Sequence, residues 1–102
     1  MAEELVHYTA ESTDVHTPYP EVLIYRHEWN ANSQQWVHLY PPIAAGRWNR
    51  PPKSRRGHAA YEDTLDQSLR RIGYYTPSGW DYFAGTYYAH DVKWIGVPKR
   101  ER

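Results

Sequence analysis

Histidine supplies the first candidate chemistry in this sequence. His27 and His38 occupy the centres of a mirrored pattern, Tyr-x-His-x-Trp followed by Trp-x-His-x-Tyr. In an antiparallel hairpin their Cβ atoms would lie about 5 Å apart, which is close enough to share a metal ion. His90 becomes a third ligand only if its strand lies alongside. Zinc usually takes three or four well-placed ligands, and no His-Glu-x-x-His spacing occurs, so we favour an aromatic ladder without a metal.

Other catalytic patterns are weak or missing from the sequence. There is no Gly-x-Ser-x-Gly nucleophile motif, no glycine-rich phosphate loop after a strand, and no cysteine. Glu62, Asp63 and Asp66 are typical of the solvated side of a helix. We therefore predict no catalytic residue, no cofactor and no metal. A small metal-dependent or histidine-based hydrolase is the least favoured of the functions considered.

The elements that would position the histidines begin with a β-hairpin. Residues 21–29 are rich in strand-forming side chains, residues 30–33 (Asn-Ala-Asn-Ser) indicate a turn, and residues 36–40 return before two prolines. A one-residue slip would destroy all three matched pairs, so the pattern predicts its own register. One face of the hairpin would then carry Tyr25, His27 and Trp29 opposite Tyr40, His38 and Trp36.

One helix is predicted over residues 58–72. Tyr61, Leu65, Leu69 and Ile72 follow the 4, 4, 3 spacing of a single apolar stripe. We expect this stripe to pack on the hairpin face that carries the aromatic side chains and Leu23. Bases late in the helix also suit the helix dipole.

The remaining segments complete a prediction of the fold class. Residues 80–97 are β-like, with three arrangements left open: a hairpin turning at residues 84–85, a hairpin turning at 90–91, or one strand over 86–97. We expect residues 1–17 to be a mobile segment, or an edge strand at best, and residues 98–102 to be a basic tail. Residues 18–97 would form one small α+β domain, β-β-α-β(β), with three or four antiparallel strands covered by one helix.

A basic loop is the clearest candidate for binding. Prolines at positions 51 and 52 oppose regular structure between the hairpin and the helix, so we expect an exposed, mobile loop. Its cations could contact phosphates, and its tryptophan could stack on an unpaired base. The predicted binding residues of the loop are Arg47, Trp48, Arg50, Lys53, Arg55 and Arg56.

The composition of the chain is unusual in its aromatic residues and in the distribution of its charges. The chain has ten Tyr and five Trp but only one Phe, and its net charge is zero. Residues 1–46 carry six acids and one base, whereas residues 47–102 carry eleven bases and six acids. Such a split favours oriented contact with a charged partner or a homodimer formed between opposite ends, and neutralisation within the fold is the alternative.

Tyr, Trp and Arg are enriched at binding hot spots, whereas nucleic-acid-binding domains are usually basic overall. We therefore predict a non-enzymatic module that docks on and modulates a larger protein partner. Nucleic-acid binding through the basic loop is the alternative. The sequence shows no secretory signal and no membrane-spanning run, so we expect a cytoplasmic protein.

Overall fold

The computed structural model describes residues 5–13, 15–18, 20–52, 54 and 57–96 of the 102-residue chain. It is a small α+β domain with one helix and an antiparallel sheet, as predicted, but the sheet has seven strands rather than three or four. The elements are β1 (Val6–Ser12), β2 (Glu21–Asn30), β3 (Gln35–His38), β4 (Ala44–Arg47), α1 (His58–Arg71), β5 (Tyr74–Tyr75), β6 (Asp81–Phe83) and β7 (Thr86–Trp94).

The strand order β3-β2-β1-β7-β5 places β1 in the middle of the sheet, while β4 pairs with β2 and β6 pairs with β7. The expectation of an edge strand at best within residues 1–17 is therefore wrong. Tyr8, Ala10 and Ser12 point to one side, and His7, Thr9 and Glu11 point to the other. In the sequence, this mixture of small, aromatic and polar side chains is typical of a solvated segment. In the structure, β2 and β7 both pair with β1.

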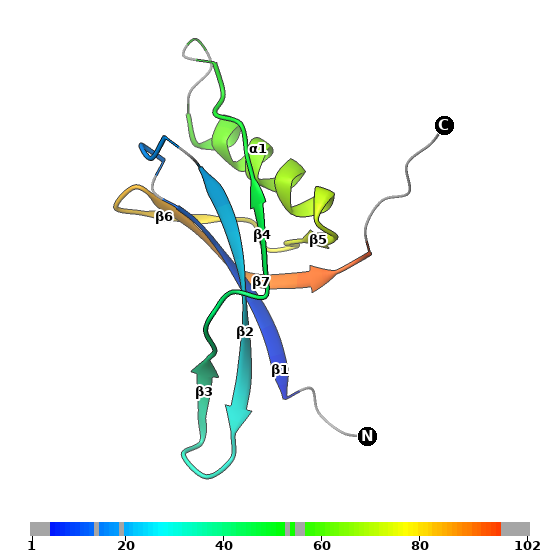
Figure 1. Ribbon diagram of the computed structural model, residues 1–102. Coiled ribbons are helices and arrows are strands. Elements are labelled where there is room, and N and C mark those ends of the chain that lie inside the picture. The colour runs from blue at the N-terminus through cyan, green and yellow to red at the C-terminus, as the bar shows by residue number, and fades with distance from the viewer. Residues whose placement is uncertain (1–4, 14, 19, 53, 55–56, 97–102) are drawn as a thin grey trace.

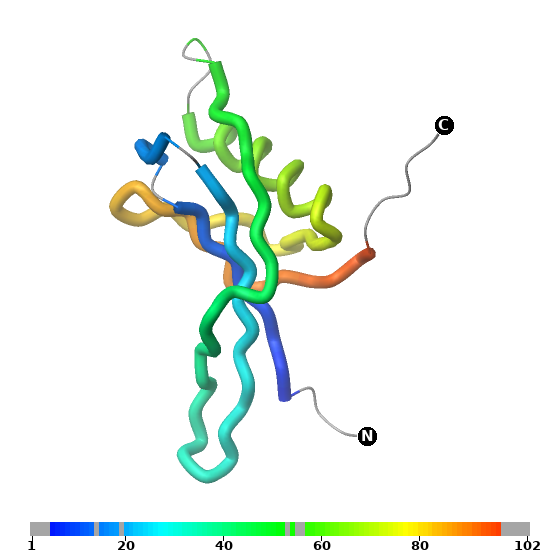
Figure 2. Tube along the Cα trace, in the orientation of Figure 1, coloured from blue at the N-terminus to red at the C-terminus, as the bar shows by residue number. Residues whose placement is uncertain are grey.

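The β2–β3 hairpin has the predicted register and projects beyond the part of the sheet that α1 covers (Figures 1 and 2). The Asn30 side chain organises its turn by accepting hydrogen bonds from the backbone N–H groups of Asn32 and Ser33, at 2.9 and 3.2 Å. After β3, the chain crosses a cis Tyr40–Pro41 bond and pairs again with β2 as β4.

Of the three arrangements left open for residues 80–97, the hairpin at residues 84–85 is the one present. Phe83 lies opposite Thr86, and Ala84 and Gly85 both have positive φ angles. The second strand of this hairpin continues as the long strand β7, which pairs with β1, β5 and β6.

Helix α1 buries the predicted stripe, but on the face of the sheet opposite to the one we expected. Leu65 and Leu69 are fully buried with Val22 and Ile24 of β2, whereas Tyr25 lies outside this core cluster. The aromatic face of the hairpin is thus turned away from the helix.

Small residues on the buried face give a physical reason for this choice, because they let α1 approach the strands closely. A Cβ atom added to Gly46 would lie 3.2 Å from Ser68 Oγ and 3.3 Å from Ile72 Cγ2. Ala10 and Ala89 are likewise buried in the same cluster. No helix in the described part of the chain is long and apolar enough to cross a membrane.

Candidate functional site

The sheet face opposite α1, which we call the open face, is built around the mirrored hairpin. His27 lies opposite His38 and Trp29 opposite Trp36, as predicted. Their ring centroids are 4.5 and 5.5 Å apart, respectively. The third predicted pair lies beyond the last paired residue of β3, but the rings of Tyr25 and Tyr40 still meet edge to face at 5.5 Å. The six predicted ladder residues therefore lie on this face in two contacting groups, Trp29 with Trp36 and Tyr25, His27, His38 and Tyr40 together.

Strand β1 adds a third histidine that sequence reasoning missed. His7 stacks on His27 with a centroid distance of 4.6 Å and an interplanar angle of 7°, and it meets Trp36 edge-on at 4.4 Å. Thr9 Oγ1 lies 2.8 Å from His27 Nε2 and fixes that ring further. The sequence offered no signal for this contact, because it depends on β1 pairing with β2.

Burial lowers the pKa values of His7 and His27, so both imidazoles are harder to protonate. It lowers the pKa of His27, and the neighbouring imidazoles of His7 and His38 lower it further. The pKa of His7 is also lowered by burial, although the carboxylate of Asp91 acts in the opposite direction. Neutral rings are the forms that pack here, so acid should weaken this part of the sheet.

The stack is not arranged as a metal centre. Over residues 5–13, 15–18, 20–52, 54 and 57–96, no three His, Cys, Asp or Glu side chains are placed to hold a metal ion. His90 does not join His27 and His38 as a ligand, since its Nε2 lies 3.0 Å from Asp81 Oδ2. His38 Nε2 is buried, and no described group forms a hydrogen bond with it.

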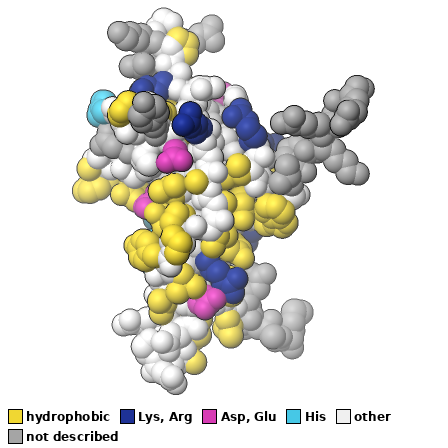
Figure 3. Space-filling view, in the orientation of Figure 1, with side chains coloured by type: hydrophobic (Ala, Val, Ile, Leu, Met, Phe, Trp, Pro, Cys, Tyr) yellow, Lys and Arg dark blue, Asp and Glu magenta, His cyan; other side chains and the backbone are white. Residues whose placement is uncertain are grey.

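The open face remains accessible at several large side chains. Tyr40 is 73% exposed and Trp36 is 44% exposed, while Phe83 at the end of β6 is 74% exposed. Figure 3 shows hydrophobic side chains gathered around the middle of the molecule, with Lys and Arg side chains above and below them. Isolated exposed rings are ordinary, but neighbouring exposed aromatic rings are typical of interaction sites.

Charged groups on the open face do not form a basic patch. By register, Glu11, Glu21 and Asp81 lie on this face together with Arg47, which stands opposite Glu21, and the Lys93–Asp91 ion pair also lies on this side of the sheet. The Glu11 carboxylate accepts a hydrogen bond from Tyr25, whose pKa is raised by burial and then by this acid. Carboxylates and aromatic rings therefore dominate the chemistry of the face.

The structure divides the predicted basic loop. Arg47 ends β4 and is exposed, whereas Arg50 donates from Nε to the backbone carbonyl oxygen of Val15 at 2.8 Å. Trp48 is only 3% exposed and packs edge-to-face on Tyr61 at 5.8 Å, so it is a core residue and not an exposed stacking platform. The buried Trp48 side chain thereby anchors this end of the loop to the core. The predicted residues Lys53, Arg55 and Arg56 lie outside the described residues.

A second polar cluster lies where α1 begins, beside a hollow of about 270 Å³. His58 Nδ1 is 2.7 Å from the Tyr87 hydroxyl, and the rings of Tyr61 and Tyr82 stand within 6 Å of the Tyr87 ring. Burial, followed by the neighbouring Tyr82, Glu62 and Tyr61, raises the pKa of Tyr87 to about 12. This phenol stays protonated at neutral pH, so it braces His58 without acting as a base.

Comparisons with known proteins add no assignment. No family model matches the chain, and neither the curated proteins nor the solved structures contain a significant match.

Proposed function

We propose that this chain is a non-enzymatic interaction module that docks on a larger protein partner, and modulates it, through the open face of its sheet. One observation carries the proposal: the single described helix covers one face of a seven-stranded sheet, and the opposite face carries a connected ladder of Tyr, His and Trp side chains.

The exposed rings would provide the anchors of such an interface. Trp36, Tyr40 and Phe83 are large, have few rotatable bonds and lose little conformational entropy when a partner covers them. His38, which stacks on Tyr40, is already packed against His27, so this part of the platform is pre-organised before binding.

The charges favour a protein partner over a nucleic acid. Glu11, Glu21 and Asp81 would repel phosphates, and Trp48 is not available for base stacking. The same carboxylates and rings are suited to a protein surface that presents arginine beside apolar side chains. An arginine can stack on an aromatic face and pair with a neighbouring carboxylate.

Two adjacent residues of β3 give a matched test of the face. Trp36 points to the open face and is 44% exposed, whereas Val37 points to the other face and is 38% exposed. The full chain, immobilised and incubated with nuclease-treated lysate of the source organism, should retain a protein partner identified by mass spectrometry. Trp36→Ser and Tyr40→Ser should abolish retention, and Val37→Ser should preserve it.

Three results would contradict the proposal. Equal loss in Val37→Ser would mean that the hairpin matters only structurally. Full retention in both open-face variants would place the interface elsewhere. Binding that disappears after nuclease treatment, and that falls steeply with salt on generic DNA or RNA, would favour the nucleic-acid alternative.

A further inference from the structure

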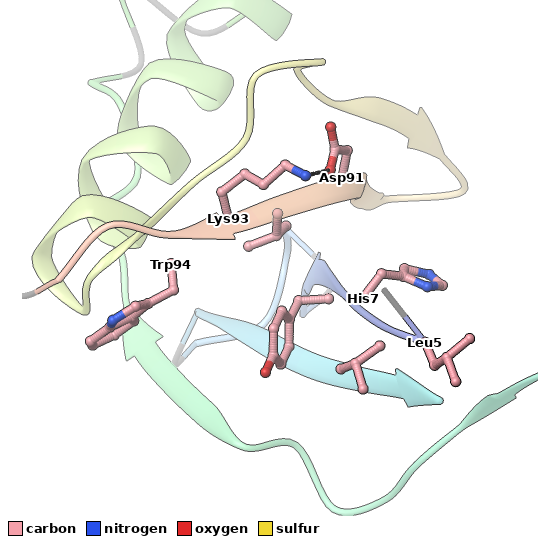
Figure 4. A pocket seen from close by; sticks show the side chains of 8 residues that line it. Leu5, His7, Asp91, Lys93 and Trp94 are labelled. Atoms are coloured by element: carbon pink, nitrogen blue, oxygen red, sulfur yellow. Dashed lines mark ion pairs between the residues drawn. The ribbon is translucent and has the colours of Figure 1, made fainter. Parts of the chain in front are cut away.

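A separate feature of the sheet is the notch, by which we mean the gap between the beginning of β1 and the end of β7. The two strands pair from Glu11 to Tyr8 of β1, with a bulge on β7, and Tyr8 opposite Val92 is the last pair. Beyond it the end of β7 turns away from the beginning of β1 (Figure 1). The notch holds a pocket of about 470 Å³ (Figure 4).

The directions of the backbone N–H and C=O groups along β1 and β7 show which of them face the notch. The Leu5 carbonyl accepts from Trp29 N–H on β2, and the N–H of Ile95 donates to Gly73 on the β5 side. Backbone direction alternates from residue to residue in an antiparallel ladder. The N–H and C=O groups of Val6 and of Trp94 must therefore point into the notch, where no described strand pairs with them.

The walls of the notch differ on its two sides. On the side of α1 the rings of Tyr8 and Trp94 both contact Tyr74, at 6.3 and 5.0 Å. Trp94 is 58% exposed, so this aromatic wall is open to an apolar group. On the other side, Lys93 Nζ lies 3.4 Å from Asp91 Oδ1, and both side chains are about half exposed. Figure 4 shows this ion pair above the pocket, with Trp94 at one end and Leu5 and His7 at the other.

We propose that the notch binds an extended peptide segment of a partner protein by strand addition. The segment's main chain would bond to Val6 and Trp94, as an added strand bonds to a sheet edge. Its alternate side chains would meet different chemistry: an apolar one against Tyr8 and Trp94, and a polar one beside the Asp91–Lys93 pair. The backbone groups favour this class of ligand, because the main chain of a peptide supplies both donors and acceptors, whereas a polyanion supplies acceptors only. His7 borders both this pocket and the open face, but the variants that test the two proposals, at Val6 and at Trp36 and Tyr40, are different.

Selection from a displayed library of linear seven-residue peptides on the immobilised full chain tests the notch. We expect the enriched peptides to share an apolar residue, and amide hydrogen exchange to show protection of Val6 and Trp94 when a synthesised peptide binds. Val6→Pro removes one donor that faces the notch, while the β1–β2 bonds of Leu5 and His7 remain. Val6→Pro should reduce the affinity for the peptide about tenfold. Val6→Ala keeps the N–H and should leave the affinity unchanged.

A modified peptide provides a control that does not depend on whether the Val6→Pro variant folds, because it is tested on the unmodified chain. Methylation of the single peptide nitrogen that pairs with the notch should also weaken binding about tenfold, and methylation of its neighbours should not. Failure to enrich any peptide, equal binding by the two Val6 variants, or insensitivity to N-methylation would overturn the proposal. Concentration-dependent dimerisation that protects the same two amides without peptide would overturn it as well, and would assign the notch to a second copy of the chain.

Discussion

Gly73 connects α1 to β5 and provides the sharpest stability prediction. Its φ angle is +97°, and a Cβ atom there would overlap Trp94, lying 2.9 Å from Cη2. Gly73→Ala therefore adds a backbone penalty of about 1–2 kcal/mol for the left-handed conformation to a penalty of about 1–3 kcal/mol for overpacking. We expect the free energy of unfolding to fall by about 2–5 kcal/mol, measured by urea denaturation.

Gly79 is the matched control for this substitution. Its φ angle is +79°, but no heavy atom lies within 4 Å of an added Cβ, so Gly79→Ala should cost only the backbone part, about 1–2 kcal/mol. In a Trp94→Ala background, Gly73→Ala should cost the same as Gly79→Ala. If Gly73→Ala is no more destabilising than Gly79→Ala, or if its cost is unchanged without the indole, Trp94 does not pack over Gly73 and the geometry of the notch wall is incorrect.

Three further predictions concern the core and the histidine stack. Leu65→Ala should lower the free energy of unfolding by about 2–5 kcal/mol, because Leu65 is fully buried; an unchanged melting temperature would refute its place in the core. Ser12→Ala should cost about 1–3 kcal/mol, since Ser12 Oγ accepts the buried N–H of Tyr87 at 2.9 Å, and a cost near zero would show that the N–H has another acceptor. Because burial lowers the pKa values of His7 and His27 below 6.5, the unfolded chain binds protons first. Urea denaturation should therefore show full stability above pH 6.5 and a decline on acidification towards the folded-state pKa values, a decline that should be smaller in His27→Gln.

The hairpin and helix were predictable because their signals are local. The mirrored Tyr, His and Trp positions flank a turn sequence, and only one register brings all three pairs together. The spacing of Leu65 and Leu69 likewise identifies a stripe without reference to any other segment. Both features can be derived from residues close together in the chain.

Strand β1 and the buried tryptophan depend instead on distant partners. Nothing near His7 or Thr9 indicates that β2 and β7 will flank them, since β1 pairs with residues 10 to 22 positions away in β2 and 77 to 84 positions away in β7. The burial of Trp48 also depends on a residue from another part of the chain. Its neighbours are arginine and asparagine, which indicate a loop, but Tyr61 of α1 receives its ring.

The choice of which sheet face the helix covers shows how the open face arises. Both faces of β2 are apolar near its start, where Val22 and Ile24 alternate with Leu23 and Tyr25, so hydrophobicity alone does not decide between them. Gly46 lets α1 approach the sheet closely on the side of Val22 and Ile24. The rings of the hairpin lie on the opposite face of the sheet. They pack against one another, and the sheet keeps a pre-formed aromatic face that α1 leaves uncovered.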